Sequence, residues 1–215
     1  MHNLLPGLRN FSEKVFPTQQ KHFEALSQGQ KPHTLLITCS DSRIDPNLVT
    51  QTKPGEIFIV RNAGNVVPPY GASRGGEEAA IEFAVDGLGV TNIVVCGHSQ
   101  CGAMAAIAND VNLDKMPSVK RWLDHAQSTR RRMADLPGKC DLHDVVEDNV
   151  LVQVDNLKTH PAVSAAIRGG RVQVFAWVYN FESGSIAIYD PDAKRYVLST
   201  EVREETVEDA ARFAL

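Results

Sequence analysis

The chain has 215 residues, of which 43% are apolar, which is enough for one sizeable hydrophobic core. Its formal net charge of -4 provides no basic surface, so binding to nucleic acid or to an anionic membrane is not expected. The sequence has no apolar run of about 18 residues and no apolar signal segment near its start. We therefore expect a soluble, intracellular α/β protein.

The first predicted element is a helical arm. Apolar residues recur at helical spacing from Leu8 to Leu26, with Pro17 between them. This pattern predicts two short helices. We expect residues 1–30 to form the arm and residues 31–215 to form one α/β domain.

Five short apolar runs predict strands, and three of them, 34–38, 57–60 and 92–96, have the branched, two-sided apolar character of a buried parallel sheet. The run 172–178 predicts a fourth strand of the sheet. A fifth run, 185–189, follows a turn-rich loop and predicts an edge strand. The fold class is therefore α/β, with a central, mostly parallel sheet of about four strands plus an edge strand.

Helical spacing of apolar residues predicts helices that flank this sheet. They cover 76–89, 101–109, 144–159 and 200–213. The first of them supplies the crossover connection that two neighbouring parallel strands require.

Side chains with metal-binding chemistry follow two of the predicted strands. Cys39 ends the first strand, and His98 and Cys101 follow the third. Taken singly, a cysteine at a strand end, such as Cys39, or a histidine in a loop, such as His98, is more often an ordinary structural residue than a metal ligand. Together they stand where an open α/β sheet binds its ligands, at the carboxyl ends of strands. Two thiolates and one imidazole predict a catalytic zinc site, because three protein ligands leave the fourth position open.

Charged and flexible residues surround these three candidates. Asp41 and Arg43 are two residues apart in one loop, and a bidentate pair between them would fix the carboxylate. That carboxylate could accept a hydrogen bond from zinc hydroxide or swing inward to coordinate the metal itself. Gly102 would begin a helix whose free N–H groups favour an anion beside the metal.

Three stretches that contain these residues resemble the signature motifs of the β-carbonic anhydrases. They are residues 39–43 (CSDSR), 61–65 (RNAGN) and 97–103 (GHSQCGA), and the resemblance extends over about residues 30–197. It implies reversible hydration of carbon dioxide to bicarbonate and a proton, with one zinc ion on Cys39, His98 and Cys101. It also implies that Asp41 and Arg43 hold the zinc-bound hydroxide.

The resemblance further implies an obligate homodimer or a higher even oligomer. In this family the N-terminal helices wrap the partner, and the active site lies at the subunit interface. A cytoplasmic location is expected, and a carboxysome or an organelle stays open as an alternative.

The sequence resembles the plant-like and cyanobacterial-like subtype more than the allosteric subtype. The allosteric subtype has Trp three residues before the first Cys ligand, where this chain has Leu36. Gln30 stands nine residues before that Cys, at the position of a substrate-binding Gln in the plant-like subtype. The carbon dioxide pocket of that subtype maps onto Phe58, Ala63 and Phe83.

Two other functions remain open. Carbon disulfide and carbonyl sulfide are linear and apolar like carbon dioxide, so the same fold and metal could hydrolyse them. A non-catalytic bicarbonate-sensing protein is the third reading, although a sensor would not need Asp41 and Arg43. For the enzyme, two thiolates that neutralise the zinc charge predict a raised pKa of the zinc-bound water and an alkaline activity optimum. No proton shuttle is recognisable among the remaining histidines.

Overall fold

The structure is a computed structural model that describes residues 3–134, 141–202, 211 and 213–215. The chain divides into two compact units, Met1–Lys31 and Pro32–Leu215, which are described in turn. None of the helices in this part of the chain has the length and apolar character needed to span a bilayer.

The first unit is an unbroken helical segment. Helix α1 (Leu5–Asn10) passes through a π-helical turn (Phe11–Val15) directly into α2 (Phe16–Leu26). Proline removes a backbone donor, and its ring clashes with the carbonyl four residues before it. The wider turn before Pro17, in which the Phe16 N–H donates to the Phe11 carbonyl, accommodates that ring. The prediction of two separate short helices was therefore wrong.

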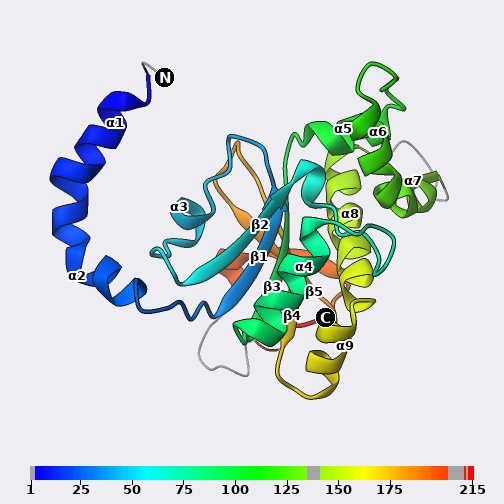
Figure 1. Cartoon of the computed structure of the whole chain (residues 1–215). Helices are drawn as coiled ribbons and strands as arrows, with labels where there is room; N and C mark the ends of the chain where they lie inside the picture. The colour runs from blue at the N-terminus through cyan, green and yellow to red at the C-terminus, as the bar shows by residue number, and fades with distance from the viewer. Residues whose placement is uncertain (1–2, 135–140, 203–210, 212) are drawn as a thin grey trace. The chain divides into compact units, whose positions relative to one another are not determined.

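The second unit contains a six-stranded sheet in the order β2-β1-β3-β4-β5-β6 (Figure 1). The strands are β1 (Thr34–Cys39), β2 (Ile57–Asn62), β3 (Asn92–His98), β4 (Gln173–Tyr179), β5 (Ile186–Asp190) and β6 (Arg195–Leu198). The first four are parallel, as the sequence predicts, and β5 and β6 are antiparallel.

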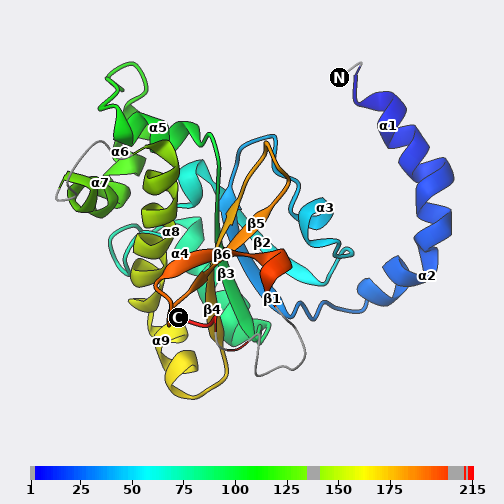
Figure 2. The ribbon, with the colours of Figure 1, turned by 180° about the vertical axis from the view of Figure 1, so that it is seen from behind.

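The predicted edge strand is β5, but it is not the edge of the sheet. Strand β6 lies beyond it, as the view from behind shows (Figure 2). Only four residues long, β6 follows a charged turn and contains no apolar run of strand length, so the sequence pattern missed it.

Helices flank the sheet in the second unit. Those described are α3 (Pro46–Thr50), α4 (Gly76–Glu82) with a π-helical turn (Phe83–Gly87), α5 (Gly102–Ala108), α6 (Pro117–Leu123), α7 (Gln127–Ala134), α8 (Leu142–Lys158) and α9 (Pro161–Arg168). The predictions at 76–89, 101–109 and 144–159 correspond to α4, α5 and α8. The periodicity of apolar residues does not indicate α3, α6 or α9, which have eight residues or fewer.

The C-terminal prediction at 200–213 falls largely outside the described residues. Within the described part, Ser199–Glu201 is a short 3₁₀ turn.

The main core lies between α4, α8 and α9 and one face of the sheet. Alternate residues of the central strands, such as Leu35, Ile93 and Val174, face these helices because side chains alternate across a strand. Helix α8 approaches the end of β3 closely at Gly97, where a Cβ atom would lie 2.7 Å from a Val150 methyl. The glycine thus lets a core helix pack directly beside the residue that precedes His98.

Candidate metal centre

The three candidate ligands meet at the carboxyl-terminal edge of the sheet. Cys39 is the last residue of β1, His98 is the last residue of β3, and Cys101 immediately precedes α5. Their candidate ligand atoms all lie within 4.8 Å of one another, and each side chain is at most 6% exposed. The parallel register of β1 and β3 therefore assembles the predicted cluster.

The histidine has the tautomer that a metal ligand needs. His98 Nδ1 lies 2.7 Å from the Ser99 carbonyl oxygen, which can only accept, so Nδ1 carries the proton. The other ring nitrogen, Nε2, is buried and has no hydrogen-bond partner among the residues that the structure describes. An unpaired buried acceptor is costly, and coordination of a metal ion would satisfy it.

The two cysteines also fit a zinc ion. Without metal they share a hydrogen bond, which holds the pKa of the Cys39 thiol well below its usual value and raises the pKa of the Cys101 thiol. Only one of the two is then readily ionised. Zinc would keep both as thiolates, because a coordinating thiol is deprotonated. The donor set thus fits a tetrahedral site with one open position.

A backbone donor supports the first ligand. The Gly64 N–H donates to Cys39 Sγ at 3.3 Å. Gly64 has a φ of +79°, and a Cβ atom there would lie 2.9 Å from the Ala103 Cβ, so glycine meets both requirements of this position. The neighbouring Ala63 and Gly102 line one apolar cavity of about 410 Å³ beside this loop.

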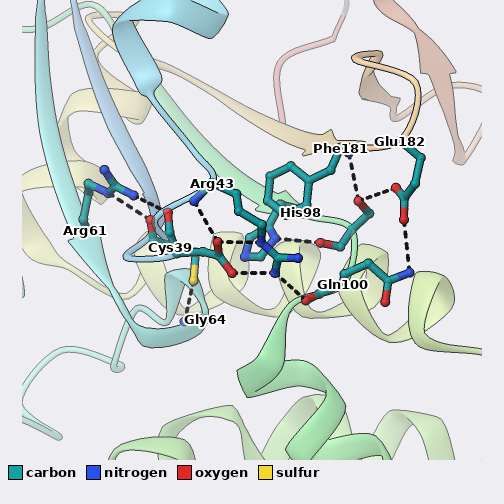
Figure 3. Close-up of polar contacts among 10 residues, drawn as sticks. Cys39, Arg43, Arg61, Gly64, His98, Gln100, Phe181 and Glu182 are labelled. Atoms are coloured by element: carbon teal, nitrogen blue, oxygen red, sulfur yellow. Dashed lines mark hydrogen bonds and ion pairs between the residues drawn. The ribbon is translucent and has the colours of Figure 1, made fainter.

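Asp41 and Arg43 form the predicted bidentate pair. Arg43 Nε donates to Asp41 Oδ1 at 2.9 Å, and Nη2 donates to Oδ2 at 2.7 Å. The guanidinium holds the pKa of the Asp41 carboxyl well below its usual range. Arg43 Nη2 also donates to the Gln100 carbonyl at 3.1 Å, and its guanidinium lies 4.5 Å from the Phe181 ring centroid (Figure 3). Asp41 is therefore fixed and ionised.

Two further residues, which were not predicted to belong to the site, organise its loops. Arg61 donates to the carbonyls of Cys39 at 3.0 Å and Asp41 at 2.7 Å. The Glu182 carboxylate accepts from Ser99 Oγ at 2.8 Å and from Gln100 Nε2 at 3.1 Å (Figure 3). The motif around Arg61 could have indicated its position. Glu182 is 83 residues from Ser99, and no local pattern signals their contact.

The predicted pocket residues do not all gather at the ligands. Phe58 and Phe83 lie together, with ring centroids 6.1 Å apart. In the β1–β2 register Phe58 pairs with Leu35, whereas Cys39 pairs with Asn62. Four residues along a strand separate the aromatic pair from the metal ligands by about 13 Å. Gln30 belongs to the first unit and stays a prediction.

The open α/β sheet and the Cys-His-Cys centre define the class of this protein as a zinc enzyme with three protein ligands. A model of the family "Carbonic anhydrase" matches residues 34–186. The carbonic anhydrase of Synechococcus elongatus is 48% identical over 191 residues, which are 86% of this chain and 70% of that protein. That of Pseudomonas aeruginosa is 44% identical over 202 residues, 92% of this chain and 91% of that one.

Solved structures agree with these matches. The β-carbonic anhydrase CcaA has a TM-score of 0.87 at 43% identity and covers 92% of this chain and 91% of its own. One of the tetrameric β-carbonic anhydrases of Sordaria macrospora has a TM-score of 0.77 at 28% identity, covering 87% of this chain and 95% of its own. The chain belongs to the carbonic anhydrase family, in its β class.

Proposed function

We propose that this chain hydrates carbon dioxide reversibly to bicarbonate and a proton at the Cys39–His98–Cys101 centre. The observation that carries the proposal is the ligand cluster beside a fixed carboxylate, in a chain of the carbonic anhydrase family. When bound, zinc supplies a Lewis acid that lowers the pKa of a water molecule and makes it a nucleophile near neutral pH.

The protein residues orient that nucleophile. Asp41 Oδ1 accepts from both the backbone N–H and Nε of Arg43, whereas Oδ2 accepts from Nη2 alone among the described residues. A carboxylate oxygen can accept more than one hydrogen bond, so Oδ2 has capacity left. Asp41, being ionised, can only accept. It would therefore accept a hydrogen bond from the proton of the nucleophile and leave the nucleophile's free electron pair directed toward the substrate carbon.

The arrangement of Asp41 supports the open-site subtype. The candidate ligand group comprises Cys39, His98 and Cys101 and does not include Asp41, within the residues described. Because Arg43 engages both carboxylate oxygens, rotation of Asp41 onto the metal would break the bidentate pair. We infer that the fourth position stays available to water.

Activity is expected to rise toward alkaline pH. With zinc bound, the thiolates of Cys39 and Cys101 would neutralise the charge of the ion, so it would lower the pKa of a water molecule less than a three-histidine site does. Ionisation of Asp41 does not determine the pH at which activity rises, because the pKa of its carboxyl lies far below neutrality. Stopped-flow hydration with a pH indicator, on zinc-assayed protein, should show fast turnover at about pH 8.5 and weaker turnover at about pH 7.

A rate that is already flat at pH 6 would contradict the expected pH dependence. A zinc-loaded chain with no hydration at either pH would contradict the function itself. Assays with carbon disulfide and carbonyl sulfide would then separate a hydrolase of those substrates from a bicarbonate sensor.

We also infer that two copies of the chain build each complete site, and a homodimer is the smallest such assembly. Phe58 lies about 13 Å along the strand from its own chain's ligands, and Phe83 packs against Phe58, so the pair cannot line that chain's carbon dioxide pocket. Phe83 is nevertheless 50% exposed, as a residue awaiting a partner would be. The N-terminal unit exposes further apolar side chains, at Leu4, Leu8 and Phe11.

Complementation tests this assignment. One tagged chain carries Cys101→Ala, and a second carries Phe58→Ala with Phe83→Ala; they are co-expressed and the heterodimer is isolated. Truncating the pocket should lower kcat/KM roughly tenfold in the double-alanine homodimer. The heterodimer should keep one complete site and about half of the wild-type activity. A heterodimer no more active than the mean of the two homodimers would refute the shared site.

A further inference from the structure

The hydrogen bond to Cys39 comes from a peptide group that a distant side chain holds. The peptide unit between Ala63 and Gly64 directs its N–H at Cys39 Sγ, 3.3 Å away. Its carbonyl oxygen, on Ala63, accepts from the indole Nε1 of Trp122 in α6 at 2.8 Å. Since the atoms of a peptide unit lie in one plane, a contact that fixes the carbonyl also fixes the direction of the N–H.

The next carbonyl along the chain is held as well. Gly64 O accepts from Asn149 Nδ2 of α8 at 3.2 Å. The two held carbonyls thus flank the Gly64 Cα atom, whose positive φ only glycine adopts readily. Helices α6 and α8 together fix the backbone on both sides of the donor N–H.

Backbone groups determine the orientation of the Asn149 amide. The Val67 N–H, which can only donate, bonds to Gln153 Oε1 at 2.8 Å. The Gln153 amide must therefore donate from Nε2 to Asn149 Oδ1, at 2.9 Å. Asn149 is then left with its own N–H₂ group for Gly64 O, which can only accept.

The hydrogen-bonded pair Asn149 and Gln153, called the Asn149–Gln153 ladder below, lies in the interior of the second unit. Asn149, Gln153 and Thr129 are all 0% exposed, and Thr129 Oγ1 donates to Asn149 Oδ1 at 3.2 Å. Buried amides in a core helix are costly unless every polar atom is satisfied. Both ends of the Asn149–Gln153 ladder terminate on the loop 63–67 that carries the donor to Cys39.

We propose that Trp122 and Asn149 are positioning residues for the metal ligand Cys39. They hold the two carbonyls beside Gly64 so that its N–H stays on Sγ. A hydrogen bond accepted by a thiolate stabilises the sulfur lone pairs and holds the sulfur in one orientation. Donation by Trp122 to the same peptide unit polarises that N–H further. Neither side chain touches the metal; both act through the backbone. The inference rests on the proposed metal centre.

Trp122→Phe tests the proposal, because it keeps an aromatic ring and removes the N–H. The chain offers a matched control in Trp177→Phe, since Trp177 Nε1 is buried and has no hydrogen-bond partner within the described ranges. Each variant is loaded with cobalt(II). The thiolate-to-cobalt charge-transfer absorption and the rate of metal release to a chelator are then compared with wild type.

The charge-transfer band of Trp122→Phe should move to longer wavelength, because a thiolate that loses a hydrogen bond gives up an electron more easily. Metal release should become about tenfold faster, as for other residues that orient a metal ligand. Asn149→Ala should shift both readouts in the same direction. Trp177→Phe should match wild type. A Trp122→Phe protein with the band and release rate of Trp177→Phe would overturn the proposal.

The hydrogen bond can also be measured in the unaltered protein if Trp122→Phe does not fold. In ¹⁵N-labelled chain loaded with ¹¹³Cd, the Gly64 amide proton should show scalar coupling to the metal through the sulfur. Absence of this coupling would overturn the inference. A wild-type chain that holds no metal would overturn both proposals, whereas a metal-loaded chain without hydration activity would overturn the proposed function alone.

Discussion

Replacement of Cys101 by alanine is expected to remove zinc and nearly all carbon dioxide hydration. Cys101 contributes one of three ligand atoms that lie within 4.8 Å of one another, and two ligands cannot retain the ion in the same geometry. Without the metal, the attacking water keeps its ordinary pKa of about 15.7 and is a poor nucleophile near neutral pH. The expected loss in kcat/KM is therefore at least about a thousandfold. Stopped-flow rates and zinc content per chain measure both effects.

Cys96→Ala is the matched control for this variant. Cys96 is also a buried thiol, in β3 two residues before His98, but it is not part of the ligand group. Burial raises the pKa of Cys96 to about 12, so it stays protonated and unreactive. This control should keep its zinc and its activity. Equal loss in both variants would mean that the cysteine substitutions act through the fold and not through the metal.

Asp41→Asn is expected to lower kcat roughly a hundredfold while the zinc content stays unchanged. Asparagine has nearly the same shape, but its amide nitrogen would point a donor at Arg43 or at the nucleophile, where the carboxylate now accepts. The orientation of the nucleophile is lost, and the ligand cluster is not touched. Steady-state kinetics, zinc analysis and a thermal unfolding midpoint on the same preparation would separate these effects.

Stability should change little in Asp41→Asn. Arg43 is about half exposed, and exposed ion pairs add little to the free energy of unfolding. Asp114→Asn serves as the control, because it also breaks an ion pair, with Lys120 at 2.7 Å, but away from the ligands. Activity that falls equally in both variants, or zinc that is lost from Asp41→Asn, would contradict the assigned role.

The metal ligands could be predicted because each of them follows a strand that the sequence marks clearly. Parallel strands place their carboxyl ends together, so Cys39 and His98 meet without any knowledge of the loops. The pair of Asp41 and Arg43 is local, and a spacing of two residues suffices to predict it. These features depend on short-range pattern and on one rule of sheet topology.

The residues that hold the loops could not be found in this way. Trp122 is 59 residues from Ala63, and Asn149 is 85 residues from Gly64. Trp122 lies in a seven-residue helix that starts at a proline and has no long amphipathic pattern. Phe58 and Phe83 were predicted to line the carbon dioxide pocket. The sequence does not say whether that pocket belongs to the same chain or to a second copy of it. Such contacts depend on how separate elements pack, which no periodicity encodes.

The wide separation of these contacts along the chain has a consequence for biosynthesis. Synthesis delivers Cys39, His98 and Cys101 in the first 101 residues, whereas Asn149 and Glu182 emerge later. At about 5–20 residues per second, Glu182 follows Cys101 by about 4–16 s. At the start of that interval a nascent chain carries every metal ligand but lacks Trp122, Asn149 and Glu182, the side chains that hold Gly64, Ser99 and Gln100 in place. We therefore expect stable capture of zinc only after α8 and Glu182 have been synthesised.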